Sequence, residues 1–200
     1  YDWGSTTPLP LSANLETGAG HDVEPFALAS VVPSSLPTPP RVDFNRDGKT
    51  DLMWHNSVTG DMFVWFLDGA TLPGSTYLRP ESFANAQWQI RALADFDRDG
   101  DTDVLWHNVA TGDLYAWILD GTVAVGGQYL TPRTVIDTQW QIRDAADLNG
   151  DGSPDLLWHH QASGELYVWF MDGLVQKSGA FLDPKAVADN RWRVQGLDDF

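Results

Sequence analysis

Three acidic loops of this chain share one spacing of oxygen-bearing side chains. Residues 43–51 read Asp-Phe-Asn-Arg-Asp-Gly-Lys-Thr-Asp, and the same pattern returns at 95–103 and 147–155. Side chains that carry oxygen alternate with side chains that can point outward, and the glycine at the sixth position permits the sharp turn that wraps a loop around a small, hard cation. We therefore predict that each loop binds a divalent metal ion through oxygen atoms.

Calcium is the predicted ion, because magnesium poorly tolerates a flexible loop that offers so many protein oxygens. An EF-hand is excluded, since it needs a bidentate Glu at the twelfth loop position, where Trp54, Trp106 and Trp158 stand. We expect about three Ca²⁺ per chain. The predicted ligands, with backbone carbonyl oxygens at the seventh position of each loop, are Asp43, Asn45, Asp47, Lys49 (carbonyl) and Asp51; Asp95, Asp97, Asp99, Asp101 (carbonyl) and Asp103; and Asp147, Asn149, Asp151, Ser153 (carbonyl) and Asp155.

Asp, Asn and Gly are also ordinary turn residues, so a single loop of this kind could be a plain hairpin end. Three loops with identical spacing favour the metal, because carboxylates crowded into nine residues repel one another unless a cation lies between them. The chain has 12 Lys and Arg against 28 Asp and Glu, a net charge of −16. This charge argues against nucleic acid and anionic lipid as partners.

The loops belong to a repeat of 52 residues. Tryptophans at 54, 106 and 158, at 65, 117 and 169, and at 88, 140 and 192 keep the same register, as do the Asp-Gly pairs at 68, 120 and 172. We predict repeats at 43–94, 95–146 and 147–198, with a truncated fourth beginning at 199–200. Residues 1–42 hold seven of the twelve prolines and are expected to be an N-terminal arm or linker.

Each repeat is predicted to form about four antiparallel strands. The segments 52–55 and 62–67 form a hairpin around Thr59-Gly60-Asp61, another strand precedes the next loop at 89–94, and one more lies near 77–78. Segment 62–67 is apolar on both faces and should be covered on both sides, as in the stacked blades of a β-propeller, with a linear stack of sheets as the alternative. A propeller needs about four to eight blades. The missing ones could come from residues 1–42 and 192–200, from a second chain, or from a longer natural protein.

The pattern Asp-Phe-Asn-x-Asp-Gly-x-x-Asp-Leu-x-Trp-x-Asn, followed by Thr-Gly and Trp-x-x-Asp-Gly, resembles the FG-GAP or VCBS-type repeat of bacterial secreted and surface proteins. The resemblance covers about 43–200. It implies a propeller, calcium in the loops and roles in adhesion or carbohydrate binding, as in integrin α-chains and some propeller lectins. Trp-His-Asn at 54–56 replaces the integrin-type Gly-Ala-Pro, so integrin-like ligand recognition is not expected.

The tryptophans and histidines fall into repeat positions with different expected roles. Trp65, Trp117 and Trp169, and also Trp54, Trp106 and Trp158, are expected in the core, whereas Trp88, Trp140 and Trp192 are the best candidates for stacking on a sugar ring. His55, His107 and His159 recur in every repeat, so they are expected to be structural hydrogen-bonding groups. His160 replaces Asn56 and Asn108, which makes it a better candidate for a specific role.

A non-catalytic, extracellular binding or adhesion module is the predicted function, with carbohydrate or a surface protein as partner. We find no motif of a metalloprotease, serine hydrolase or nucleotide-binding loop. No apolar run is long enough for membrane insertion, cysteine is absent, and Tyr1 suggests a mature chain or a fragment. Extracellular calcium modules bind at about 10⁻⁴–10⁻³ M, which favours an extracellular or cell-surface location. The alternatives are a self-assembling surface protein, for which a homo-oligomer is plausible, and an accessory domain of a secreted hydrolase.

Overall fold

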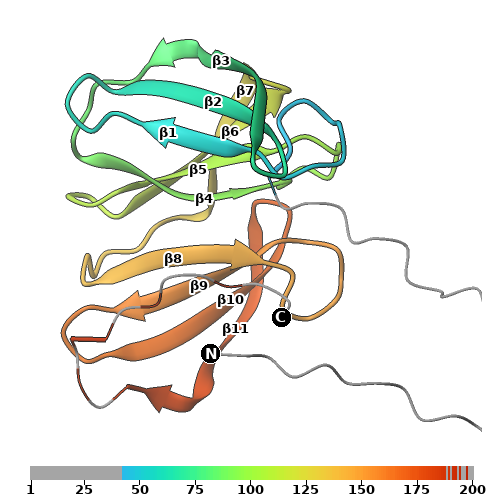
Figure 1. Cartoon of the computed structure of the whole chain (residues 1–200). Helices are drawn as coiled ribbons and strands as arrows, with labels where there is room; N and C mark the ends of the chain where they lie inside the picture. The colour runs from blue at the N-terminus through green and yellow to red at the C-terminus, as the bar shows by residue number, and fades with distance from the viewer. Residues whose placement is uncertain (1–41, 188, 190, 193, 195–196, 198–200) are drawn as a thin grey trace, which may run out of the picture. The chain divides into compact units, whose positions relative to one another are not determined.

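The computed structural model describes residues 42–187, 189, 191, 192, 194 and 197 (Figure 1). Within this part of the chain there are eleven strands and no helix, so the all-β prediction is confirmed and no helix is long and apolar enough to cross a membrane. The strands are β1 (Leu52–His55), β2 (Asp61–Asp68), β3 (Thr71–Ser82), β4 (Trp88–Ala94), β5 (Asp103–Asn108), β6 (Asp113–Asp120), β7 (Val123–Thr134), β8 (Trp140–Ala146), β9 (Asp155–His160), β10 (Glu165–Asp172) and β11 (Val175–Ala186).

Antiparallel pairing groups these strands into three sheets. Strands β4, β5, β6 and β7 pair in chain order, and β8, β9, β10 and β11 repeat that arrangement. The first sheet contains β1, β2 and β3. Single parallel bridges, Arg79 to Val123 and Thr131 to Val175, join β3 to β7 and β7 to β11. The predicted count of about four strands is therefore met in the second and third sheets.

The sheets cross the boundaries of the sequence repeats. Strand β4 closes the first sequence repeat but pairs with β5 of the second, and β8 pairs with β9 in the same way. The second and third acidic loops thus connect the first and second strands of a four-stranded sheet, and the first loop precedes β1. The residues one repeat before β4 are 36–42, and only Val42 of them is described. The predicted roles of residues 1–42 and 192–200 in closing a ring therefore fall mostly outside the described residues.

Alternating side chains in the second hairpin strand explain where the core lies. In β6, Leu114 and Ala116 are fully buried, whereas Tyr115 and Trp117 are only half-buried. The same difference separates Met62 from Phe63 in β2. The prediction that this strand is covered on both faces is therefore only partly right. One face is in the core, and the aromatic face is partly open to solvent.

The structure buries or half-buries the predicted core tryptophans, with Trp54 as the exception. Trp106 and Trp158 are buried, because β4 and β8 pair beside them at Ile90 and Ile142. Trp54 was expected in the core but is 48% exposed. Within the described residues β1 pairs only with β2, so no strand covers this end of the first sheet. Of the other expected core set, Trp169 is buried, and Trp65 and Trp117 are half-buried.

The expected hydrogen-bonding role of the recurring histidines is wrong for His107. Its ring is fully buried, and neither ring nitrogen has a hydrogen-bond partner among the described residues. The ring lies edge-on to Trp158 of the next sheet, with centroids 5.7 Å apart, and His55 lies on Trp106 at 5.8 Å in the same way. The histidine recurs because it fills a contact between neighbouring sheets.

His160 takes over the turn contact of the asparagines it replaces. Asn108 Oδ1 accepts hydrogen bonds from the backbone N–H groups of Ala110 and Thr111. His160 Nδ1 accepts one from Ser163 N at 3.0 Å, which leaves Nε2 to donate to Asp137 at 3.2 Å. The break in the repeat is therefore a substitution of one turn-stabilising acceptor for another.

A glycine in the turn before the second hairpin strand recurs because no side chain fits there. Gly60, Gly112 and Gly164 have φ of 79°, 79° and 73°. A Cβ on Gly112 would lie 1.9 Å from the carbonyl oxygen of Val135. At the same place Val135 N donates a hydrogen bond to Gly112 O at 3.0 Å, which holds the end of the outer strand against the turn.

Candidate metal centre

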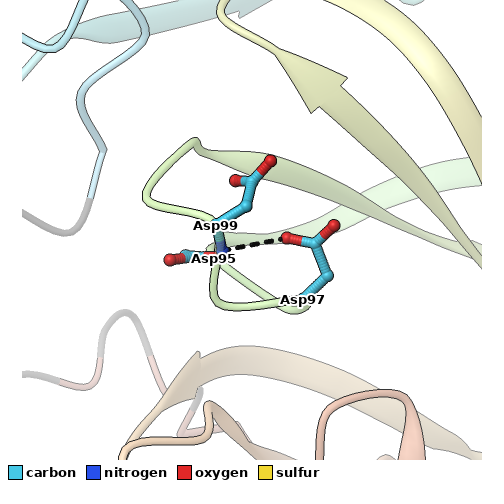
Figure 2. Close-up of side chains that lie close together, drawn as sticks. All are labelled: Asp95, Asp97 and Asp99. Carbon is cyan, nitrogen blue, oxygen red and sulfur yellow. Dashed lines mark hydrogen bonds between the residues drawn. The ribbon is translucent and has the colours of Figure 1, made fainter.

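The second acidic loop brings three carboxylates together at the surface. It leaves β4 at Ala94 and enters β5 at Asp103. One oxygen atom from each of Asp95, Asp97 and Asp99 lies within 4.8 Å of the other two. Figure 2 shows the three side chains on this loop. Asp95 is half-buried, and the other two are exposed. An arrangement of this kind offers only hard oxygen donors, which are the ligands that Ca²⁺ and Mg²⁺ take.

Backbone hydrogen bonds to the first carboxylate wrap the loop. Asp95 Oδ1 accepts from Asp99 N at 3.1 Å, and its Oδ2 accepts from Gly100 N at 2.9 Å. Asp97 Oδ1 accepts from Asp99 N at 3.2 Å, the contact drawn in Figure 2. These hydrogen bonds hold the loop in a tight turn, which keeps one oxygen of each of the three carboxylates near the others.

All three loops have this conformation. The first carboxylate accepts backbone N–H bonds from the fifth and sixth positions in every loop: Asp43 from Asp47 and Gly48, and Asp147 from Asp151 and Gly152. Asp147 accepts a third one from Gly150. The sixth-position glycines have φ of 79°, 94° and 84°, in the region that favours glycine. The three loops, which share one spacing in the sequence, therefore also share one backbone conformation.

The first and third loops carry asparagine where the second carries Asp97. Asn45 Nδ2 donates to Asp47 Oδ2 at 3.2 Å, and Asn149 Nδ2 donates to Asp151 Oδ2 at 2.9 Å. This amide contact is the first cause that lowers the pKa of Asp151. In the second loop, burial followed by the charge of Asp99 raises the pKa of Asp97. A bound cation would therefore relieve more repulsion between carboxylates in the second loop than in the first or third.

The ninth-position aspartates brace the loops. Asp103 Oδ2 accepts from Phe96 N at 2.9 Å, and its Oδ1 accepts from Leu119 N in β6 at 2.9 Å. Asp51 and Asp155 make the equivalent pairs. Burial raises the pKa of Asp103 to about 7. These three residues hold each loop to its sheet, and their further role as metal ligands stays a prediction.

Arginines at the fourth loop position contact the seventh-position side chain of the next loop, which the sequence analysis missed. Arg46, at the fourth position of the first loop, forms a two-pronged ion pair with the buried carboxylate of Asp101 in the second loop. Arg98 reaches Ser153 in the third loop and pairs with Asp172 at 2.6 Å. Each arginine has positive φ, 59° for Arg46 and 65° for Arg98. The sequence does carry a signal for these contacts. An arginine at the fourth position of one loop is followed by an acidic or hydroxyl residue at the seventh position of the next loop.

Lys49 differs from the other seventh-position residues, since its ammonium pairs with Asp68 of its own repeat at 2.9 Å. The third loop differs at the fourth position, where Gly150 stands in place of arginine, with φ of 78°. An arginine contact thus links the first loop to the second through an ion pair, and the second loop to the third through a hydrogen bond to a serine hydroxyl. Among the described residues it is not continued at either end.

The tryptophans predicted to stack on sugar lie in different surroundings. Trp88 and Trp140 are half-buried and line hollows formed largely by other aromatic rings. Trp192 is 68% exposed and borders a separate hollow with His159, Leu166, Val187 and Val194. Trp88 packs against the core cluster that contains Phe44 of the first loop, and Trp140 against the cluster that contains Phe96 of the second.

The described chain is all-β, and an oxygen-rich loop recurs before β1, β5 and β9, which is the organisation of an acidic repeat protein. The family model for the FG-GAP-like repeat matches residues 43–106 and 95–158, and the chain belongs to this family. The resemblance inferred from the sequence is confirmed by these two copies. Neither the curated proteins nor the solved structures contain a match.

Proposed function

We propose that the chain is a calcium-binding, non-catalytic module of β-propeller blades that acts outside the cell in binding or adhesion, with carbohydrate as its ligand class. The observation that carries the proposal is the convergence of Asp95, Asp97 and Asp99 within 4.8 Å in a loop whose backbone conformation occurs three times. Calcium fits this donor set better than a softer metal ion, because every side-chain donor is oxygen.

A bound Ca²⁺ would neutralise the crowded carboxylates and stiffen the loops that precede β1, β5 and β9. The second loop would hold it through the carboxylates at 95, 97 and 99, and the first and third loops would use Asn45 and Asn149 at the middle position. Calcium modules outside cells bind at about 10⁻⁴–10⁻³ M, a range that supports an extracellular location. The metal is proposed as a structural element.

Blade-like sheets support the propeller. Each full sheet runs in order from the strand before an acidic loop to a long outer strand, and neighbouring sheets share buried core residues, among them Leu105 and Trp158. We propose that segments outside the described residues close the ring. The second candidate, a self-assembling surface protein, is favoured by the first sheet, in which β1 pairs only with β2 within the described chain.

Asp99→Ala tests the structural role of calcium. Ligands that bind only the folded state stabilise it by about 2.7 kcal/mol at a hundredfold excess over Kd. We therefore expect the variant to lower the unfolding midpoint by about 5 °C or more in calcium and to have little effect in chelator. Glu81→Ala removes an exposed carboxylate outside the loops and serves as the control. An equal drop with and without calcium would show that the loop acts without metal.

A further inference from the structure

Two hollows lined by aromatic rings recur with the period of the sequence. The first has a volume of about 240 Å³ and the second about 340 Å³. The first, called here the β4–β7 pocket, is lined by Phe83, Trp88, Trp106, Tyr115, Trp117 and Tyr129. The second, the β8–β11 pocket, is lined by Val135, Trp140, Trp158, Tyr167, Trp169 and Phe181. Every residue of the second stands 52 positions after one of the first, so the pocket is a property of the repeat.

Each pocket has a buried floor and an open rim. Trp106 and Trp158 form the floors and are 1% and 2% exposed. Tyr129 and Phe181, on the outer strands, are 40% and 45% exposed. Half-buried Trp88 and Trp140 complete the walls. A ligand can therefore reach aromatic ring faces from solvent without opening the core.

A glycine beside each pocket positions a tyrosine ring. A Cβ on Gly127 would lie 2.8 Å from the Tyr115 ring, and a Cβ on Gly179 would lie 2.7 Å from the Tyr167 ring. The outer strand can therefore pass directly over the tyrosine only because no side chain is present. In the first repeat Phe63 and Ser75 occupy these positions. The tyrosine and glycine thus occur together in the β4–β7 and β8–β11 sheets, beside these two aromatic pockets.

An ion pair lies against one ring of each pocket. The Arg133 guanidinium is 3.7 Å from the centroid of Tyr129 and pairs with Asp113 at 3.3 Å. The Lys185 ammonium is 3.9 Å from the centroid of Phe181 and pairs with Glu165 at 2.6 Å. Since a cation already lies on a pocket ring, a second organic cation would be repelled. The paired charges instead offer hydrogen-bond donors and acceptors to a neutral polar ligand.

We infer that the two pockets bind the rings of neutral pyranose sugars, one in each pocket. The C–H face of a pyranose is apolar and suits an indole or phenol ring, while its hydroxyl groups can meet the guanidinium, ammonium and carboxylate groups beside the pocket. Pockets for drug-sized ligands span about 300–1,000 Å³, so hollows of this size hold a single ring. This inference rests on the proposed carbohydrate-binding function and assigns sugar binding to these two pockets.

The test is a calorimetric titration of the full chain in calcium buffer with methyl pyranosides of glucose, galactose, mannose and N-acetylglucosamine. At least one of them is expected to bind at two equivalent sites per chain and to change tryptophan fluorescence. Tyr129→Ala and Phe181→Ala should each reduce the number of sites to one, and the double variant should bind none. Tyr77→Ala is the matched control, because Tyr77 stands at the same repeat position in the first sheet and is 46% exposed.

A second pair of variants keeps the rings intact. Arg133→Gln and Lys185→Gln change side chains that are 56% and 53% exposed, so they should fold normally. Each should weaken binding at its own pocket by about tenfold, since a hydrogen bond to a charged group is lost.

Sugar binding that survives the double variant would overturn the pocket assignment and leave the proposed function standing. A wild-type chain that binds calcium but none of the pyranosides would overturn the assignment together with the carbohydrate part of that function. Binding of tetramethylammonium or of an alkyl probe in place of the sugars would show that the pocket has been assigned the wrong ligand.

Discussion

Single carboxylates in the acidic loops divide into two kinds. Asp95, Asp97 and Asp99 gather at the surface, whereas Asp103 is buried and accepts two backbone N–H groups. Sequence spacing predicts the convergence of the first three, because alternate residues of a tight loop point the same way. The bracing role of the fourth depends on Leu119 in β6, 16 residues further along the chain, so a local pattern could not reveal it.

His107 provides a residue-scale test by pH. Burial lowers its pKa to about 4, from an unfolded value of 6.5. Between these values the unfolded chain binds the extra proton, so this group's contribution to stability is lost as the pH falls from about 6.5 to 4. The loss is about 3 kcal/mol at the low end. Urea unfolding at several pH values should show a weaker acid dependence in His107→Phe than in the wild type.

His55→Phe is the control for that measurement. His55 lies at the same repeat position but is exposed, so its replacement should change the acid dependence much less. Identical pH slopes for the wild type and His107→Phe would show that the buried ring carries no such titration.

At the scale of elements, strand positions were predictable because strand formers and turn residues alternate in each repeat. The strands at 52–55, 62–67 and 89–94 and the one near 77–78 are all present. The partly open aromatic face of β6 and the exposure of Trp54 could not be predicted, because they depend on which strands cover each face. The aromatic pockets were missed for the same reason, although Trp88 and Trp140 had been singled out.

Gly112→Ala tests how the hairpin turn is tied to the end of the outer strand. A side chain there has to adopt a left-handed φ and collides with the Val135 carbonyl. We expect a loss of about 2 kcal/mol or more in the free energy of unfolding, measured with urea. Gly69→Ala shares the positive φ, 58°, but has no atom within 4 Å of its Cβ. Equal losses of unfolding free energy in the two variants would mean that the collision with the Val135 carbonyl does not destabilise the fold.

In the whole molecule, the arginine contacts between successive loops indicate how the repeats continue. Arg46 and Arg98 each reach the seventh position of the next loop, but the third loop has Gly150 in place of the arginine and the first loop has Lys49 at the receiving position. A second copy stacked in the same manner would bring glycine opposite lysine and form no ion pair. The contact between repeats is therefore not reproduced between copies.

We accordingly expect light scattering to give the mass of one chain, 22.2 kDa, across protein concentration in calcium. A mass that rises with concentration and falls in chelator would instead favour the self-assembling surface protein, with neighbouring chains completing the ring.

The most direct test of calcium binding is the number of ions bound. The chain would be stripped with chelator, dialysed and titrated with Ca²⁺ by calorimetry, with Asp99→Ala alongside. We expect about three Ca²⁺ per wild-type chain and one fewer in Asp99→Ala. A wild-type chain that binds no calcium, or a variant that binds as many ions as the wild type, would contradict this expectation.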